Sequence, residues 1–412
     1  MKNFLVHSDE VKKEMLSSIG VSSIEDLFKQ IPEKARMREL DLPDALSEME
    51  VQKRVKSLAK KNNIDYVSFA GGGTYNKFIP ACISQVANRF EFLTAYTPYQ
   101  PEISQGTLEV MYEFQTMICR LTGMDISNAT MYDCATACAE SILMAVRISK
   151  KNKVLVSNRL NPEYIDVIKT YTWANDIELQ LFDIMPENVE DFACVLVQNP
   201  DYYGELHEYK KPNTLYIVCV DVSSLSIIEP PRDADIVVGD VQTLGIPMSF
   251  GGPHAGFLAC KEQYMRQMPG RLAGKTVDAE GKPAYCLTIQ TREQHIKREK
   301  ATSNICSNQA LIGLCATLYL TVMGEKGFRQ AGYLSAKNAH KLANGLKSKG
   351  IKILNKDFYN EFVAEVDNAD KFLNKLKAQD IIGGIKIDDK KVLICATEMN
   401  TEDEIEKYLK TV

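Results

Sequence analysis

The sequence lacks the short motifs that identify several large enzyme classes. It contains no Gly-x-x-x-x-Gly-Lys-Ser/Thr phosphate loop, no dinucleotide-binding Gly-x-Gly-x-x-Gly, no His-Glu-x-x-His and no Gly-x-Ser-x-Gly. Residues 270–276 come closest to a phosphate loop but are one residue short. These absences argue against a P-loop nucleotide hydrolase, a Rossmann-type dehydrogenase, a zinc metalloprotease and an α/β-hydrolase.

The sequence also lacks an excess of basic residues. Lys and Arg total 49 against 54 Asp and Glu, which gives a formal charge of −5. Duplex binding depends on a clustered basic surface that neutralises phosphates, so nucleic acid is not an expected partner. Substrates or other proteins are the expected partners.

Paired metal-ligand cysteines and a membrane-spanning apolar run are absent as well. The 11 cysteines include no Cys-x-x-Cys pair, so the spacing predicts neither a disulfide framework nor a metal site. No apolar stretch reaches the ~18–20 residues of a membrane span, and the N-terminus becomes charged before a signal-peptide region develops. Residues 310–323, the longest candidate, are interrupted by Gly313, Thr317 and Thr321 and predict a buried core helix. We therefore expect a cytoplasmic protein without a membrane partner.

The remaining composition is that of a globular protein, and its pattern changes twice along the 412 residues. Residues 1–65 hold charge-rich helical patches, at 24–32 and 49–55, and predict a helical N-terminal arm. Residues 66–326 predict a large α/β domain. Its short apolar strings are rich in β-branched residues, as in parallel strands covered on both faces. These strings are residues 153–157, 194–197, 215–220 and 236–238.

Residues 327–412 predict a small C-terminal α/β domain. A helix from about 327 to 346 is followed by a cationic cluster and Gly350, which is a typical helix end. Apolar strings at 361–366 and 391–396 predict strands. Thr401 and Glu404 form the pattern of a capping box that opens the last helix.

Two early segments could bind a ligand. Residues 96–106 carry Tyr96 and Tyr99 beside two prolines, Pro98 and Pro101, and their phenols could bind a carboxylate. A tyrosine-rich surface loop is the alternative.

Residues 133–140 open a helix with small side chains, where backbone amides could hold a phosphate. Close packing of that helix against the sheet is the alternative there.

Two later segments are also candidates. Residues 239–257 hold five glycines and two prolines after a predicted strand, which implies close backbone approach to another surface. His254 in this segment could act as a general acid or base, although a lone histidine beside proline is more often structural. Residues 291–304 concentrate positive charge that could hold an anion, or that simply faces solvent.

Read together, these segments resemble the P-protein family of the glycine cleavage system, which is glycine dehydrogenase (decarboxylating). The resemblance is to the N-terminal half of the P-protein, which some bacteria make as a separate subunit 1. The similarity extends over nearly the whole chain. The one loose match is residues 72–77, where the family often has a histidine near Asn76 or Lys77. The segments that carry the resemblance are residues 96–106, 115–119, 121–125, 239–257, 292–308 and 397–401.

The resemblance implies the fold of pyridoxal-phosphate enzymes of the aspartate aminotransferase type. It also implies glycine decarboxylation with pyridoxal phosphate and transfer of the aminomethyl group to the lipoyl arm of H-protein. The catalytic half of the family holds the cofactor on a lysine shortly before an Ile-Pro. Alignment on Ile246-Pro247 places Gln242 at that lysine. Asp221 falls where a carboxylate pairs with the pyridine nitrogen.

We therefore expect this chain to lack the cofactor lysine. Pyridoxal phosphate is expected to be held by a lysine-bearing partner, glycine dehydrogenase subunit 2. The expected complex contains two copies of each chain. Residues expected at the partner's glycine site or at the interface are Tyr96, Tyr99, Gln100, Glu102 and His254. Thr302 and Ser303 are expected to approach the cofactor phosphate across the interface. The alternatives are a scaffold without a role in any active site, and an independent enzyme that uses Lys261 or Lys275.

Overall fold

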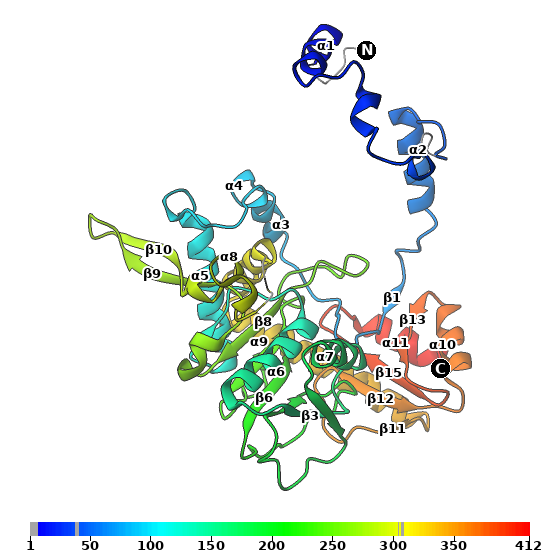
Figure 1. Cartoon of the computed structure of the whole chain (residues 1–412). Coiled ribbons are helices and arrows are strands. Elements are labelled where there is room, and N and C mark those ends of the chain that lie inside the picture. The colour runs from blue at the N-terminus through cyan, green and yellow to red at the C-terminus, as the bar shows by residue number, and fades with distance from the viewer. Residues whose placement is uncertain (1–6, 38–40, 304, 306–308) are drawn as a thin grey trace. The chain divides into compact units, whose positions relative to one another are not determined.

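The computed structural model describes residues 7–37, 41–303, 305 and 309–412 (Figure 1). Four residues of the 292–308 motif, 304 and 306–308, lie outside the described residues. The chain forms two compact units, Met1–Ile64 and Asp65–Val412. The predicted domain boundaries at 65/66 and 326/327 stay predictions.

The first unit consists of short helices. They are α1 (Asp9–Ser18), the 3-10 helices η1 (Ile24–Phe28) and η2 (Glu33–Ala35), and α2 (Glu48–Ala59). Ser23 and Ser47 each form a reciprocal capping box with an acidic residue three positions later, which fixes where η1 and α2 begin. None of these helices contains a buried residue. The predicted helical patches in this region are confirmed.

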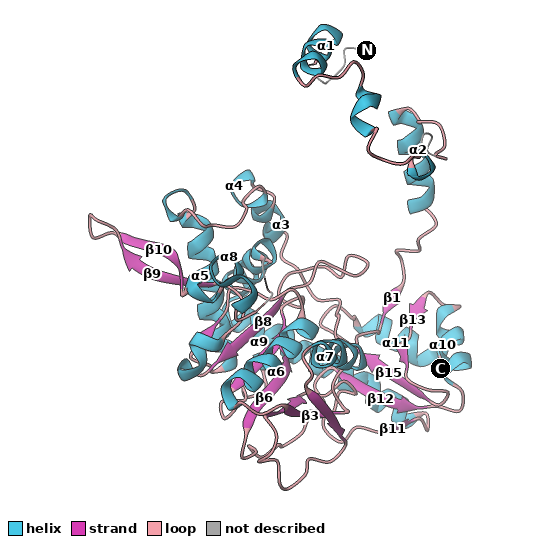
Figure 2. Cartoon of the chain, viewed as in Figure 1, coloured by secondary structure: helices cyan, strands magenta, loops and turns pink. Residues whose placement is uncertain are grey.

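A seven-stranded sheet forms the centre of the second unit (Figure 2). Its strand order is β2-β8-β7-β6-β5-β3-β4. Strands β7, β6, β5, β3 and β4 are parallel to one another, and β8 is antiparallel to both of its neighbours, β7 and β2. All four predicted strings form parallel strands. The bounds are β2 (Ile126–Ser127), β3 (Lys153–Ser157), β4 (Glu178–Phe182), β5 (Cys194–Gln198), β6 (Leu215–Asp221), β7 (Ile236–Asp240) and β8 (Gly256–Cys260).

Both faces of this sheet are covered, which explains why its strands read as continuous apolar strings. Along β3, Val154 and Val156 belong to one buried cluster and Leu155 to the other, because successive side chains of a strand point to opposite faces. Helices α6 (Cys134–Ser149) and α7 (Pro162–Ala174) contribute to the first cluster. Helices α5 (Gln105–Thr122) and α9 (Ala310–Ser348) contribute to the second.

Several elements were not predicted from the sequence. Strand β8 has no β-branched residue and β4 is an edge strand with exposed positions, so neither carries the apolar signal of the central strands. Strands β9 (Leu272–Val277) and β10 (Pro283–Thr288) form an antiparallel hairpin. The near-match to a phosphate loop therefore lies largely within β9. The minor elements are α3 (Cys82–Ala87), α4 (Phe90–Leu93), η3 (Pro101–Ile103), η4 (Ser224–Ser226), η5 (Glu262–Gln267), η6 (Gln290–Arg292), α8 (Gln294–Lys297) and η7 (Arg298–Lys300).

The C-terminal part is built on a four-stranded antiparallel sheet in the order β11-β12-β15-β14. The predicted strands at 361–366 and 391–396 are its central pair, and the capping box of Thr401 and Glu404 is present. A further parallel pair, β1 with β13, joins the beginning of the second unit to this part. The elements are β1 (Val67–Ser68), β11 (Lys352–Ile353), β12 (Glu361–Glu365), α10 (Ala369–Lys377), β13 (Ile381–Ile382), β14 (Ile385–Lys386), β15 (Lys391–Cys395) and α11 (Glu402–Thr411).

Helix α9 connects the two sheets and is interrupted once. Gly324 has the non-helical angles φ 58° and ψ −177°, which separates an apolar first half from the second half predicted at 327–346. Among the described helices, α9 alone is long and apolar enough to span a membrane by length and composition. Core helices pass the same test, and Ile312, Leu314 and Tyr319 of its first half are buried.

Gly204 offers a test of the contact between the two sheet regions. Its φ is +83°, and an added Cβ would lie 2.1 Å from the carbonyl oxygen of Glu361. Gly281, in the turn of the β9–β10 hairpin, has a φ of +82° with open space around it. We expect Gly281→Ala to cost about 1 kcal/mol of backbone strain, and Gly204→Ala about 3 kcal/mol or more because overpacking is added. Chemical denaturation measures both, and equal losses would contradict a close contact at Gly204.

Candidate functional site

Gln242 follows β7 and lies at the position that the family resemblance assigns to a cofactor lysine. Its side chain is only 1% exposed. Oε1 accepts a hydrogen bond from the Tyr75 amide at 2.9 Å, and Nε2 donates to the carbonyl oxygens of Tyr75 at 3.0 Å and Ile246 at 2.8 Å. The amide thus fixes the backbone of two segments, and a lysine, which has no acceptor, would leave the Tyr75 amide unpaired.

A small cavity lies beside Gln242. Its volume of about 30 Å³ is roughly the share of one water molecule in the liquid. Strands β6 and β7 and the start of α6 supply most of its walls. The lining residues are Gly73, Tyr75, Cys134, Tyr164, Gln198, Cys219, Val220, Asp221, Asp240, Gln242 and Thr243.

The N-terminus of α6 was a predicted anion site, but carboxylates of the chain already occupy its amides. The Asp133 side chain accepts from the Thr136 amide at 2.7 Å as the helix cap. The Cys134 amide donates to Asp240 Oδ2 at 3.3 Å. A phosphate here would meet two carboxylates at this helix end, so the predicted packing alternative is the one the geometry favours.

Asp221 ends β6 and lines the same cavity. Its carboxylate accepts from the Ser223 amide at 2.9 Å and from the Ser223 hydroxyl at 2.8 Å. Burial raises its pKa, and the nearby charge of Lys77 acts in the opposite direction. The carboxylate therefore lies at the cavity and is bonded to its own chain, and its pairing with a pyridine nitrogen stays a prediction.

Behind the cavity lies a buried charged network that the sequence analysis did not find. Tyr75 donates through its hydroxyl to Glu361 Oε2 at 2.6 Å, and the Gly72 amide donates to Glu361 Oε1 at 2.6 Å. Burial raises the pKa of Glu361 to about 7. A charged residue that opens an otherwise apolar strand, as Glu361 opens β12, is the signal that could have revealed this network.

Lys77 is the buried cation of the network. Its ammonium lies 3.3 Å from Glu398 Oε2 and donates to Ser335 Oγ at 2.9 Å. Burial disfavours the charge, but the negative charges around the ammonium, including those of Glu398 and Asp221, outweigh burial and raise the pKa of Lys77. A lysine held protonated in this way is not a nucleophilic amine.

The residues at this cavity do not fit pyridoxal phosphate. Gln242, where the family resemblance assigns the lysine, cannot form a Schiff base, the helix end is capped by a carboxylate, and the cavity measures about 30 Å³. No lysine is among the described residues that line the cavity. Lys261 donates to the Arg232 carbonyl oxygen at 2.9 Å near the surface, and Lys275 lies exposed on β9, so neither points to an independent cofactor site.

The tyrosines of the 96–106 loop lie on the surface rather than at this cavity. Tyr96 is 86% exposed and Tyr99 is 43% exposed. Arg271 Nη2 donates to the Tyr99 hydroxyl at 3.0 Å, which holds that ring in place. Gln100 and Glu102 are exposed beside them. The structure thus gathers these four side chains on one exposed loop, where the surface-loop alternative and a partner contact are both compatible with their positions.

His254 is linked to the cavity through Asp240. Its Nδ1 lies 3.2 Å from Asp240 Oδ2, and this hydrogen bond raises the pKa of the imidazole. Thr302 and Ser303 lie elsewhere. They line a separate hollow of about 550 Å³ together with Glu140 and Arg147, farther along α6.

Comparison with solved structures identifies the fold. A glutamate decarboxylase from Lactobacillus brevis superposes with a TM-score of 0.64 at 12% identity, covering 93% of this chain and 96% of that one. An aspartate aminotransferase from Thermus thermophilus gives a TM-score of 0.57 at 12% identity, covering 84% and 97%. The predicted fold, that of pyridoxal-phosphate enzymes of the aspartate aminotransferase type, is confirmed.

Closer similarity identifies the family. The model of the family described as glycine cleavage system P-protein matches residues 2–412. A solved glycine decarboxylase (P-protein) of the glycine cleavage system, in inhibitor-bound form, superposes with a TM-score of 0.91 at 38% identity and covers 99% of both chains. The chain belongs to the glycine cleavage system P-protein family.

Relatives of the subunit 1 type match over their full length. The probable glycine dehydrogenase (decarboxylating) subunit 1 of Geobacillus thermodenitrificans is 42% identical, over 99% of this chain and 98% of the relative. The protein of the same description from Maricaulis maris is 40% identical over 99% of each. The family and the subunit type inferred from the sequence are confirmed.

The raised pKa of Glu361 predicts a specific pH dependence of stability. The folded state binds this proton more tightly than the unfolded state, because the pKa rises from 4.5 to about 7. The contribution of this proton to the free energy of unfolding is complete at pH values below the unfolded pKa. It is lost as the pH rises through about 7, and the loss is roughly 3 kcal/mol. Glu361→Gln cannot titrate. Wild type should therefore lose roughly 3 kcal/mol relative to this variant between about pH 4 and pH 8.

Urea unfolding at both pH values measures this difference. Glu365→Gln, at the half-buried end of the same strand, is the matched control and should follow wild type. A constant difference between wild type and Glu361→Gln across this pH range would show that Glu361 does not titrate as the burial implies.

Proposed function

We propose that this chain is the non-cofactor-binding subunit of a glycine-decarboxylating P-protein and that it completes the active site of a lysine-bearing partner, glycine dehydrogenase subunit 2. The partner holds pyridoxal phosphate, which supplies the electron sink for decarboxylation when bound. Glycine is the substrate, and the lipoyl arm of H-protein receives the aminomethyl group. The chain is expected to be inactive alone and to assemble as two copies with two copies of the partner.

The observation that carries this proposal is the filled cofactor position. Family membership links the chain to glycine decarboxylation, yet the amide of Gln242 is committed to three backbone hydrogen bonds. A chain that cannot hold the cofactor contributes to the reaction only through another chain that does. This reasoning favours a two-chain enzyme over an independent enzyme that uses Lys261 or Lys275.

Two exposed regions support contact with a partner. The glycine-rich loop after Gln242 carries Phe250, which is 93% exposed, and the Tyr96 ring is similarly free of its own chain. Large exposed aromatic rings are typical of protein interfaces. A second protein that covers these surfaces would remove them from water.

We assign roles at the partner's site to residues on these surfaces. The phenols of Tyr96 and Tyr99, with Gln100 and Glu102 beside them, face the glycine carboxylate or its surroundings. His254 approaches the same region from the glycine-rich loop. Thr302 and Ser303 approach the cofactor phosphate, and the guanidinium of Arg147 in the same hollow suits an anion, although Glu140 lies there too.

A scaffold that contributes nothing to an active site is the competing function. It predicts the same complex and the same absence of cofactor from this chain. Only substitutions that leave the complex intact while removing a proposed site contact separate the two functions.

The first prediction is that the isolated chain carries no covalent pyridoxal phosphate. Absorption spectra before and after borohydride reduction, followed by peptide mapping, measure this. In the complex with the lysine-bearing partner, the same treatment should label one lysine of the partner. A reduced pyridoxyl adduct at stoichiometric yield on any lysine of this chain would refute the assignment.

The second prediction concerns Tyr96→Phe in the assembled complex. Losing one hydrogen bond to a charged group should cost about 1.5–3 kcal/mol, or on the order of tenfold to a hundredfold in carbon dioxide exchange into glycine. Light scattering should show an unchanged complex. Tyr99→Phe and Thr302→Ala are expected to lower the rate in the same way.

Tyr333→Phe is the matched control, since this tyrosine is 58% exposed on α9, away from the proposed surfaces. It should leave the exchange rate unchanged. If Tyr96→Phe, Tyr99→Phe and Thr302→Ala all match wild type in rate and in glycine dependence, the scaffold function replaces the proposed one.

A further inference from the structure

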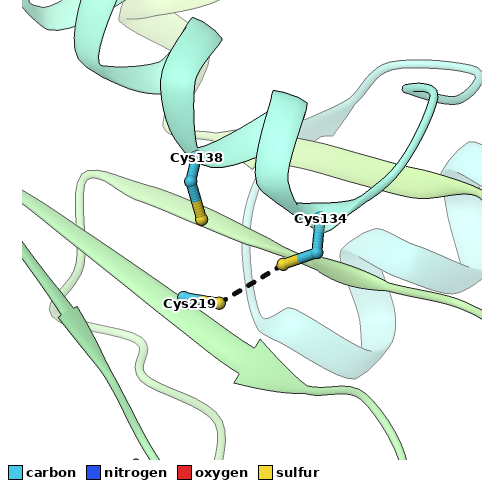
Figure 3. Close-up of side chains that lie close together, drawn as sticks. All are labelled: Cys134, Cys138 and Cys219. Atoms are coloured by element: carbon cyan, nitrogen blue, oxygen red, sulfur yellow. Dashed lines mark hydrogen bonds between the residues drawn. The ribbon is translucent and has the colours of Figure 1, made fainter. Parts of the chain in front are cut away.

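Three buried cysteines from two elements converge beside the cavity, and two of them, Cys134 and Cys219, line it (Figure 3). Cys134 and Cys138 lie one turn apart at the start of α6, and Cys219 lies on β6. Their three sulfur atoms all lie within 4.8 Å of one another, and the Cys134 and Cys219 sulfurs are 3.4 Å apart. Figure 3 shows the three side chains pointing toward a common centre. The fold therefore assembles a cluster that the sequence spacing did not predict.

The separations suit a metal coordinated by thiolates. A zinc–sulfur bond of about 2.3 Å places two sulfurs of a tetrahedral site about 3.8 Å apart. The observed range, from 3.4 Å to at most 4.8 Å, includes this value, so small side-chain movements would complete the geometry.

The cavity supplies a fourth coordination position. Cys134 and Cys219 both line it, and its volume of about 30 Å³ admits one water. Gln198 and Asp240 also line it and could hydrogen-bond to that water. Three protein ligands and a water form a common zinc coordination set.

The net charge distinguishes zinc from copper(I). Both ions bind thiolates strongly. Three thiolates leave one negative charge around Zn²⁺ but two around Cu⁺, and burial penalises the larger net charge. We propose that Cys134, Cys138 and Cys219 form a zinc site with a water in the cavity as the fourth ligand. This site is independent of the proposed role in glycine decarboxylation.

The test uses the full chain, reduced and freed of metal by a chelator. Zn²⁺ is titrated in competition with a chromophoric chelator, and Co²⁺ is added to a parallel sample as a spectroscopic probe. We expect one high-affinity metal per chain and the intense thiolate-to-cobalt charge-transfer absorption of a three-sulfur site. Bound Zn²⁺ should also raise the thermal unfolding temperature, because it binds the folded state.

Substitutions locate the ligands. Cys138→Ala and Cys219→Ala should each weaken zinc binding by more than about 100-fold. Losing a residue that only hydrogen-bonds to a metal ligand costs up to about 100-fold in affinity, and losing a ligand itself should cost more. Cys194→Ala is the matched control, since Cys194 is fully buried on β5 in the same apolar cluster but outside the group of three. It should keep both the affinity and the thermal shift. Circular dichroism of the metal-free proteins checks that each variant folds.

Several outcomes would overturn the proposal. One is an absence of stoichiometric zinc binding by the wild-type chain, which would leave the cysteines as ordinary apolar core residues. Another is equal loss of binding in Cys194→Ala, or unchanged binding in a folded Cys138→Ala. A cobalt spectrum of the wild-type chain without thiolate charge transfer would also overturn the proposal, and this measurement requires no variant. Binding of copper(I) without binding of Zn²⁺ would also refute the zinc assignment.

Discussion

The second unit depends on how one chain segment is tied to both of its sheet regions. Residues 69–78 run between the central sheet and the C-terminal sheet, and polar groups from each hold their backbone. Gln242 binds the Tyr75 backbone from the central sheet. Glu361 and Glu398 accept the Gly72 and Phe78 amides from the C-terminal side. Because Gln242 and Glu361 are buried, losing either side chain would leave an unpaired polar atom in the interior.

The same hydrogen bonds argue against a cofactor site in this chain. The Gln242 amide is bonded to the backbone of two segments, and carboxylates accept from amides at the start of α6. The amide of Gln242 is a good structural clamp because it both donates and accepts, whereas a lysine only donates. Structural use and cofactor binding are thus mutually exclusive at this position.

The sequence predicted the elements that have a local signal and missed those that do not. The four central strands and the capping box at Thr401 were found because β-branched strings and cap pairs are visible in a few consecutive residues. Strand β8, the β9–β10 hairpin and the network of Lys77 and Glu361 were not, because their stability comes from contacts between distant segments. The role of Gln242 illustrates the same limit: alignment with Ile246-Pro247 located the residue, but only the fold reveals its three bonds to the backbone of two segments.

The filled cavity has a consequence for how this subunit responds to the supply of cofactor. A protein that binds a ligand in its folded state gains stability in proportion to the logarithm of the ligand concentration, and it loses that gain when the ligand is scarce. The interior of this chain closes on its own side chains instead, around a space of about 30 Å³. In the proposed two-chain enzyme, this subunit would therefore fold independently of the cofactor supply.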